Sequence, residues 1–342
     1  GGKILVADNG RYWTSVPKTS KDFGATWSQA NSSSMNQHVS VDVSADGSKF
    51  VIANSGNGVR TSSDGLNWTQ RHSCSFCNSA AISADGSTYI AAADDGIYIS
   101  TDGVRFTKSN ASAEAWGSVA ISANGSRSIA AVTGGLIYTR NAGDTSVWRS
   151  RPSASTRNWS SVSMSADGTK LVAAVDGGFI YTSADFGVTW TERAWSARWD
   201  SVESSADGRV LAAKNYDGEF YVSWDSGLSW ASPQIHGESE SSIVAASPDG
   251  KHIATAGNRI KNSSGTPTKI QVSSDSGATW TPVGMARQWT TLAMSSSGQH
   301  LIGSVAGGGY LYMSSDFGAT WSQREASRYW TSLAMSSSGQ HL

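Results

Sequence analysis

The stretch "WSSVSMSADGTKLVAAVDGGFIYTSADFGVTW", residues 159–190, contains the pattern that decides the fold. Short runs alternate apolar and polar residues, and turns rich in Gly, Asp and Ser separate them. Such runs between such turns are typical of β-strands. The stretch therefore predicts an antiparallel meander of four strands, which we name A ("SVSMS"), B ("KLVAAV"), C ("FIYTS") and D, a short strand at "TW".

The same unit recurs along the chain with a period of about 43 residues. A later copy, residues 289–321, reads "WTTLAMSSSGQHLIGSVAGGGYLYMSSDFGATW". Units of roughly 20–50 residues that repeat in this way indicate solenoids, propellers or other arrays. A strand A is predicted to begin at each of eight positions: His38, Cys77, Trp116, Trp159, Trp199, Ser241, Trp289 and Trp330.

The two ends of the chain hold complementary parts of one unit. "ILVADNG" (4–10) matches a strand B with no strand A before it, and "WTSLAMS" (330–336) is a strand A with no strands C and D after it. Propellers close by sharing a blade between both ends, which removes free sheet edges. We therefore predict an all-β fold, an eight-bladed β-propeller of four-stranded antiparallel blades. It is a single domain over residues 1–342, and its first blade takes strands B–D from 1–30 and strand A from 330–336. The pentapeptide "RYWTS" occurs at 11–15 and 328–332, and only its second copy is expected to open a strand A.

The turn between strands C and D is the most specific repeated motif, as in "SADFGVTW" (183–190). Its Asp can accept hydrogen bonds from backbone N–H groups, its Gly supplies a conformation that Cβ would penalise, and its Trp packs in the blade. The motif resembles the Asp-box, or BNR repeat, of the sialidase-like and sortilin-like β-propellers. The resemblance implies a structural role for Asp22, Asp64, Asp102, Asp185, Asp225, Asp275 and Asp316.

Composition excludes several classes of protein. The 26 basic and 27 acidic residues balance, which argues against binding to nucleic acid. There is no apolar run of about 18 residues, so no membrane insertion is expected. No metal cluster or cofactor motif is visible, so we expect neither. Cys74 and Cys77, in "SCSFCNS", are interpreted as a loop disulfide or as two free thiols.

Antiparallel strands place the B–C and D–A connections on the face opposite the C–D turns. On that face, five of the strand A positions begin with Trp, and Arg precedes four of them by one or two residues. Trp rings can stack on sugars and Arg can bond to their hydroxyls. The alternative is that each Trp fills the space between blades, with Arg stacked on it. The candidate ligand-binding residues are Trp116, Trp159, Trp199, Trp289, Trp330, Arg157, Arg198, Arg287 and Arg328, with His38 at one Trp position and Arg259 and Lys261 in the longest B–C loop.

Asp42 and Glu203 replace small residues in strand A, on blades that should face each other across the axis. We interpret them as channel lining in preference to a catalytic pair, and we assign no catalytic residue. The sialidase "RIP" motif is absent. The leading hypothesis is a non-catalytic, extracellular or cell-surface module that binds glycans. The alternatives are a scaffold that binds another protein and a glycoside hydrolase.

Overall fold

The computed structural model describes residues 4–8, 18–20, 26, 28–31, 38–54, 56, 58–112, 114–142, 147–217, 219–231, 241–247, 249–257, 267–305, 309–324 and 330–335. Over these residues the chain forms β-strands and one short 3-10 turn, η1 (Pro152–Ala154). The predicted all-β class is confirmed. The described part of the chain holds no helix with the length and hydropathy needed to cross a bilayer.

The strands assemble into antiparallel sheets in which the neighbours are mostly consecutive along the chain. Five sheets have four strands each. Their strands are β29 (Trp330–Ala334), β1 (Ile4–Asp8), β2 (Lys18–Ser20) and β3 (Ser28–Gln29); β4 (His38–Val43), β5 (Phe50–Asn54), β6 (Gly58–Ser62) and β7 (Thr69–His72); β8 (Cys77–Ile82), β9 (Tyr89–Ala93), β10 (Gly96–Ser100) and β11 (Thr107–Lys108); β21 (Ser241–Ala246), β22 (Ile253–Gly257), β23 (Thr268–Ser273) and β24 (Thr281–Arg287); and β25 (Trp289–Met294), β26 (Leu301–Val305), β27 (Leu311–Ser314) and β28 (Ser322–Gln323).

A sixth sheet has nine strands because long strands run from one repeat unit into the next. These strands are β12 (Trp116–Ile121), β13 (Arg127–Gly135), β14 (Ile137–Asn141), β15 (Arg149–Ser150), β16 (Arg157–Met164), β17 (Leu171–Ser183), β18 (Thr191–Ser204), β19 (Leu211–Asn215) and β20 (Phe220–Ser223). In β18, the first half pairs with β17 and the second half pairs with β19. A strand D and the following strand A are therefore continuous here, where the repeat predicted a connection between them.

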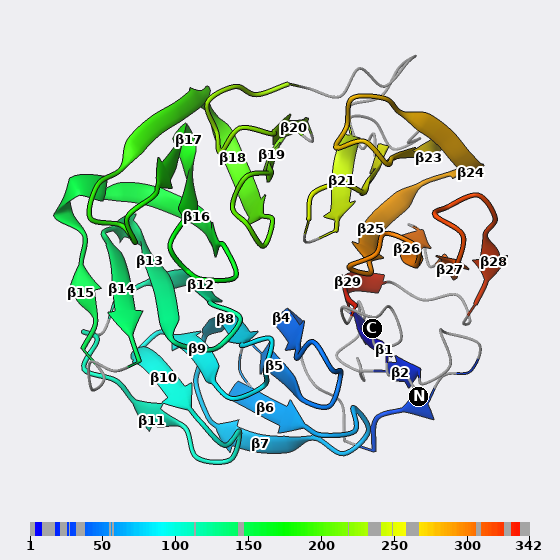
Figure 1. Ribbon diagram of the computed structural model, residues 1–342. Coiled ribbons are helices and arrows are strands. Elements are labelled where there is room, and N and C mark those ends of the chain that lie inside the picture. The colour runs from blue at the N-terminus through cyan, green and yellow to red at the C-terminus, as the bar shows by residue number, and fades with distance from the viewer. Residues whose placement is uncertain are drawn as a thin grey trace.

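The sheets stand around a central axis, with the strands expected as A nearest to it (Figure 1). Neighbouring inner strands contact one another, as β4 contacts β8, β12 contacts β16, and β25 contacts β29. Strand β29 also contacts β4 and pairs with β1, so Leu333 lies opposite Val6. The second "RYWTS" therefore opens β29 at Trp330, whereas the first, at 11–15, lies outside the described residues.

Serine hydroxyls connect inner strands that do not share a ladder. The Ser40 hydroxyl donates to the Ala80 carbonyl at 3.1 Å and accepts from the Ala80 N–H at 3.2 Å. The bond from a backbone N–H to a serine hydroxyl recurs from Val119 to Ser79, from Val162 to Ser118 and from Val202 to Ser161. Buried amides without partners are costly, so these hydroxyls substitute for the missing ladder. The abundance of Ser in strand A therefore has a structural cause.

The hydrophobic core consists of clusters between adjacent sheets. One cluster places Trp159 of β16 against Ile129 of β13 and Leu171 of β17. Strand B contributes small side chains such as Ala91 and Ala173, which are fully buried. Small residues here leave room for the larger ring of the strand A residue. Such interdigitation at close-packed density is typical of protein interiors.

Candidate functional site

The C–D turns are held by their aspartates. In the turn at 183–190, the Asp185 carboxylate accepts the Thr189 N–H at 2.9 Å and the hydroxyls of Thr189 and Ser183. Gly187 adopts φ +82°, and its carbonyl accepts the Trp190 indole N–H at 3.1 Å. Corresponding carboxylate bonds occur at Asp64, Asp102, Asp225, Asp275 and Asp316. Asp22 lies outside the described residues. These donors stabilise the charged carboxylate, so they do not leave it free for a ligand.

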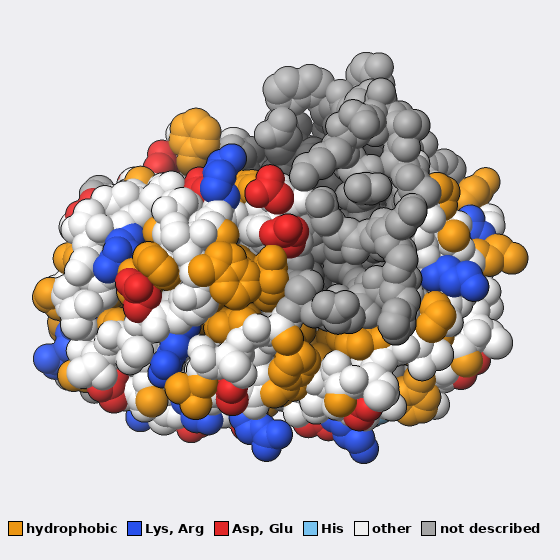
Figure 2. Space-filling view, turned by 90° about the horizontal axis from the view of Figure 1, so that it is seen from above, with side chains coloured by type: hydrophobic (Ala, Val, Ile, Leu, Met, Phe, Trp, Pro, Cys, Tyr) orange, Lys and Arg blue, Asp and Glu red, His pale blue; other side chains and the backbone are white. Residues whose placement is uncertain are grey.

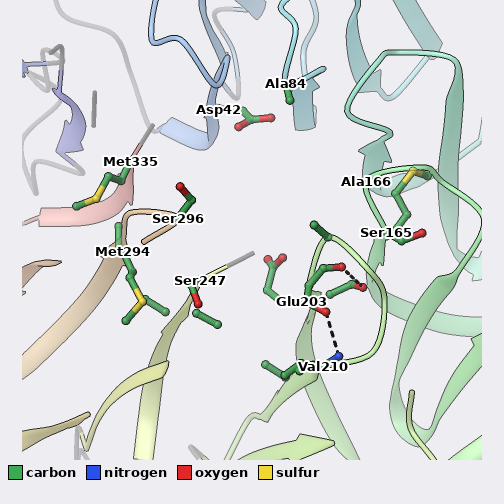
Figure 3. A pocket seen from close by; sticks show the side chains of 18 of the residues that line it. Asp42, Ala84, Ser165, Ala166, Glu203, Val210, Ser247, Met294, Ser296 and Met335 are labelled. Atoms are coloured by element: carbon green, nitrogen blue, oxygen red, sulfur yellow. Dashed lines mark hydrogen bonds between the residues drawn. The ribbon is translucent and has the colours of Figure 1, made fainter. Parts of the chain in front are cut away.

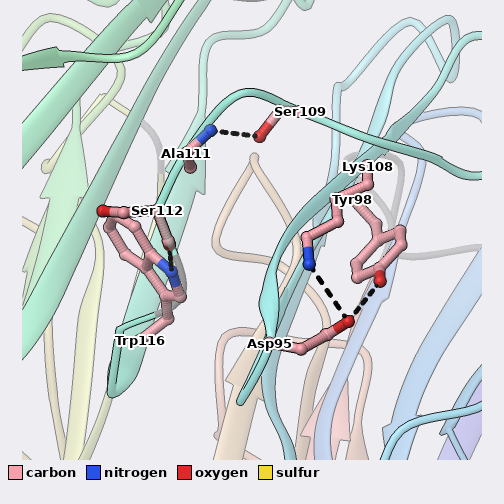
Figure 4. Close-up of polar contacts among 7 residues, drawn as sticks. All are labelled: Asp95, Tyr98, Lys108, Ser109, Ala111, Ser112 and Trp116. Atoms are coloured by element: carbon pink, nitrogen blue, oxygen red, sulfur yellow. Dashed lines mark hydrogen bonds and ion pairs between the residues drawn. The ribbon is translucent and has the colours of Figure 1, made fainter.

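Four of the tryptophans that the sequence predicted at the start of a strand A are buried. Trp116, Trp159, Trp199 and Trp289 are at most 1% exposed. Each indole N–H donates to a backbone carbonyl, as Trp116 does to Ser112 at 3.1 Å (Figure 4). These four rings are closed to a ligand, which is a correction to their proposed role as sugar platforms. Their burial fits the alternative, in which each ring fills the space between neighbouring sheets.

The same alternative also predicted that the neighbouring arginines stack on these tryptophans. This part of the prediction is wrong, because the arginines lie over tyrosine rings. Arg157 lies over the Tyr181 ring at 4.4 Å, Arg198 over Tyr216 at 4.8 Å and Arg287 over Tyr312 at 4.0 Å. Tyrosine rings attract the guanidinium groups in the same way. Arg259, Lys261 and Arg328 lie outside the described residues, as do the side chains of His38 and Trp330.

One exposed indole lies beside a buried one, and the sequence reasoning missed it. Trp195 is 41% exposed, and its ring contacts Tyr221 edge-on at 4.5 Å between centroids. The preceding residue, Ala194, has φ +54°, a left-handed conformation that is uncommon outside glycine. The related segment of β24 has Gly284 at φ +67° and then Met285, which is 70% exposed. A left-handed residue at this point turns the next side chain outward.

Further polar and aromatic groups lie in β18 and in the strands and connections that pair with it. Tyr216 is 52% exposed beneath Arg198, whose guanidinium pairs with Asp176 at 3.1 Å. Glu219 accepts hydrogen bonds from Tyr221 and Asn215 at 3.0 and 2.8 Å. We name Trp195, Arg198, Tyr216, Tyr221, Asp176 and Glu219 the aromatic patch. Figure 2 shows hydrophobic, basic and acidic side chains close together on the rim of the molecule.

A cavity of about 640 Å³ lies on the axis, lined by inner strands and by the turns that follow them. Asp42 of β4 and Glu203 of β18 both point into it (Figure 3). The Asp42 carboxylate accepts the N–H groups of Val43 at 2.8 Å and Ile82 at 2.9 Å. The two predicted channel residues therefore share one cavity, where the sequence reasoning allowed for a larger separation.

Both carboxyl groups of the cavity are harder to ionise than usual. Burial raises the pKa of Asp42 to about 6, against the lowering effect of the Ile82 and Val43 amides. Burial raises the pKa of Glu203 to about 7, and the negative charge of Asp42 adds to this shift. The Glu203 side chain is accessible to water, but the cavity walls surround it and replace most of the bulk solvent. Lys214, which also lines the cavity, is paired with Asp200 at 2.9 Å.

A disulfide joins Cys74, in the loop before β8, to Cys77, the first residue of β8. In the same sheet, the Asp95 carboxylate accepts the Tyr98 hydroxyl at 2.6 Å and pairs with Lys108 at 3.4 Å (Figure 4). The His72 ring lies over Tyr98 with 3.6 Å between centroids. Among the described residues, no three His, Cys, Asp or Glu side chains are placed to hold a metal ion.

Comparison with known proteins shows the fold. No protein-family model and no curated protein matches the sequence. A GH74 enzyme from Niastella koreensis is 15% identical over 96% of this chain and 64% of its own, with a TM-score of 0.55. The GH74 xyloglucanase from Xanthomonas campestris is 14% identical over 94% of this chain and 64% of its own, with a TM-score of 0.53. The β-propeller domain of Cps50 (Swd1) from Myceliophteria thermophila is 12% identical over 79% of this chain and 94% of its own, with a TM-score of 0.55.

These similarities, together with the antiparallel sheets around one axis, define a β-propeller. This chain spans 64% of the length of both GH74 proteins. At identities of 12–15% the likeness concerns the fold alone. One fold can host unrelated activities, so function has to be argued from the sites.

Proposed function

We propose that this propeller is a non-catalytic, extracellular or cell-surface module that binds carbohydrate at the aromatic patch. The observation that carries the proposal is the exposed Trp195 ring against Tyr221, in the same strand as Arg198, whose guanidinium lies over the exposed Tyr216 ring. The proposed site lies on the face of the molecule that the sequence predicted. Its contact residue is Trp195, however, and not one of the buried tryptophans.

The patch has the groups that sugar recognition requires. An exposed indole offers a flat apolar surface for the C–H face of a pyranose, and the Tyr216 ring offers a second. Arg198 is a planar donor, and the carboxylates of Asp176 and Glu219 are acceptors for sugar hydroxyls. Arg198 and Glu219 are already held by protein partners, so they are oriented before the ligand arrives.

The proposal includes a finer description of the architecture. The ring has eight blades, and the pairing of β1 with β29 closes it by completing a shared first blade. Six C–D turns with the same carboxylate bonds support kinship with Asp-box propellers. In this description the turn face holds the fold, and the opposite face is free to bind.

A glycan array followed by calorimetry with the best saccharide tests the binding site. Trp195→Ala is expected to weaken binding by about tenfold or more, because stacking on an aromatic ring contributes roughly 1–2 kcal/mol. Met285→Ala is the matched control, since Met285 is exposed at the related position of another sheet. The proposal fails if the wild type binds no saccharide, or if both variants bind as the wild type does.

A scaffold for a protein partner is the second candidate. Phe76 and Tyr310 in connections between strands and Met285 in β24 are exposed, and apolar residues of this kind are enriched at protein interfaces. If no saccharide on the array binds, binding to a protein partner becomes the better-supported function.

The glycoside hydrolase hypothesis has weaker support. Two carboxyl groups share the axial cavity, but no aromatic side chain is among the described residues that line it. Incubation with chromogenic glycosides tests this hypothesis directly.

A further inference from the structure

The axial cavity has an apolar wall. Most of its described lining residues are Ala, Val, Ile, Leu or Met. Six of these side chains occupy equivalent positions at or next to the ends of inner strands: Val43, Ile82, Ile121, Met164, Met294 and Met335. A volume of about 640 Å³ is within the range of small-molecule sites. The wall suits a ligand with a hydrocarbon body better than a sugar, whose hydroxyls need many polar partners.

Two negative groups interrupt this wall. Asp42 and Glu203 come from β4 and β18, which lie in different sheets, and their carboxyl groups point into the same space (Figure 3). The backbone amide of Ile82 fixes Asp42 at 2.9 Å. The negative charge of Asp42 raises the pKa of Glu203 across the cavity, so a positive charge placed between the two carboxyl groups would interact with both.

The cationic side chain among the described residues that line the cavity already has an acidic partner. Lys214 is the only Lys, Arg or His among the described lining residues, and it is paired with Asp200 at 2.9 Å. The cavity thus presents two acidic groups in an apolar surround. Carboxylates in such a site need a cationic partner or must take up protons.

We infer that the axial cavity binds an organic cation, a protonated amine with an apolar body. The ammonium group donates to the carboxylates of Asp42 and Glu203, and the hydrocarbon part packs against the side chains of Met164, Met294 and Ile121. Methionine side chains adapt well to such a body because they are unbranched and polarisable. This site is separate from the aromatic patch and does not depend on the function proposed for it.

The site also predicts a pH dependence. Asp42, Glu203 and the paired Lys214 are the ionisable groups among the described residues that line the cavity. An alkylamine stays protonated below about pH 10, as a lysine side chain does. Affinity is therefore set by the two acids and should rise as the pH passes through about 6 and about 7.

The test uses n-hexylamine as the probe, measured by calorimetry with the whole chain at about pH 8 and about pH 5. Neutral n-hexanol has the same hydrocarbon body and serves as the comparison ligand. Glu203→Gln is the principal variant, and it is expected to weaken hexylamine binding by about tenfold at the higher pH. Asp42→Asn should weaken it similarly, but it also alters the bond from Ile82 that links β4 to β8.

Two variants control for the location of the site. Asp94→Asn removes an exposed carboxylate outside the cavity, and Trp195→Ala removes the exposed indole, an aromatic ring of the kind that attracts cations. Both should bind hexylamine as the wild type does. The inference is overturned if hexylamine does not bind at about 10 mM, if hexanol binds equally well, or if Glu203→Gln leaves the affinity unchanged.

Discussion

At the scale of the residue, two tryptophans four positions apart in one strand have different roles. Trp199 is fully buried, whereas Trp195 is exposed because Ala194 adopts a left-handed backbone conformation. The Trp199 indole N–H donates to the Trp195 carbonyl at 3.2 Å, so the backbone of the exposed residue supports the buried ring. A change of the Trp195 side chain keeps this hydrogen bond.

We expect this difference in burial to appear in stability. Trp199→Ala should lower the free energy of unfolding by about 3–5 kcal/mol, because it leaves a cavity in the core. Trp195→Ala should lower it by less, about 1–2 kcal/mol, since the residue is already 41% exposed and its removal leaves no cavity in the core. Urea denaturation followed by circular dichroism measures both. Equal losses in the two variants would contradict the assigned burial.

Glu203 provides a second prediction at this scale. Its pKa is raised from 4.5 to about 7 in the folded chain, so ionisation opposes folding. The folded state therefore loses stability as the pH rises from about 4.5 through 7. Glu203→Gln should be more stable than the wild type at about pH 8, by about 1 kcal/mol once the water in the cavity is allowed for, and equally stable at about pH 4. Thermal melts across this range would refute the prediction if the two proteins differed equally at all pH values.

At the scale of the element, the C–D turn joins a carboxylate, a left-handed Gly and a Trp in one local structure. The Asp bonds orient the start of strand D, and the Trp indole closes the turn on the Gly carbonyl. Since the bonds favour the charged carboxyl, the pKa of Asp64, Asp102 and Asp275 falls to about 2. The folded state is thus favoured when the aspartates of the repeated turns are ionised.

This leads to a prediction about acid. The stabilisation from these turns is present above about pH 4 and is lost as the pH falls towards 2, because the unfolded chain then binds more protons than the folded one. Asp185→Asn should lower the free energy of unfolding at neutral pH by about 1–2 kcal/mol through lost charge-assisted bonds, and Asp94→Asn should not. Acid titration of all three proteins checks this. If Asp94→Asn lowered stability as much as Asp185→Asn did, the turn would not be the source.

The sequence predicted the elements well but the binding residues poorly, and the reason is physical. Strand existence follows from local alternation and turn residues, and the predicted strand starts at Trp116, Trp289 and Trp330 match β12, β25 and β29. The direction of the Trp195 side chain depends on a positive φ at an alanine, which composition does not reveal. Whether Trp159 is buried depends on the neighbouring sheet, so an exposed-ring prediction failed there. The meeting of Asp42 and Glu203 depends on the ring as a whole.

At the scale of the whole molecule, most inner strands contact the next inner strand around the axis, and β29 contacts both β4 and β25. It also pairs with β1, so it is involved in contacts on several sides. Its five residues, Trp330–Ala334, thus stabilise the molecule more than their number suggests.

A truncation tests this. A chain that ends before Trp330 is expected to unfold at a markedly lower temperature and to self-associate, because β1 then has an unpaired edge. Calorimetry and sedimentation measure the two effects. Removing only residues 336–342, which follow β29, is the control. A monomeric truncated chain with an unchanged melting temperature would show that the β1–β29 ladder is dispensable.

The ladder between β1 and β29 has a further consequence for how the gene can be rearranged. Since the first and last strands are neighbours in one sheet, a short linker between them and a new cut elsewhere would preserve the sheet pairings. A circular permutant that begins at β12 would then carry the β1–β29 pair as an internal hairpin-like connection. The position of the chain ends can thus be changed in the gene, while the order of the repeat units around the axis stays fixed by packing.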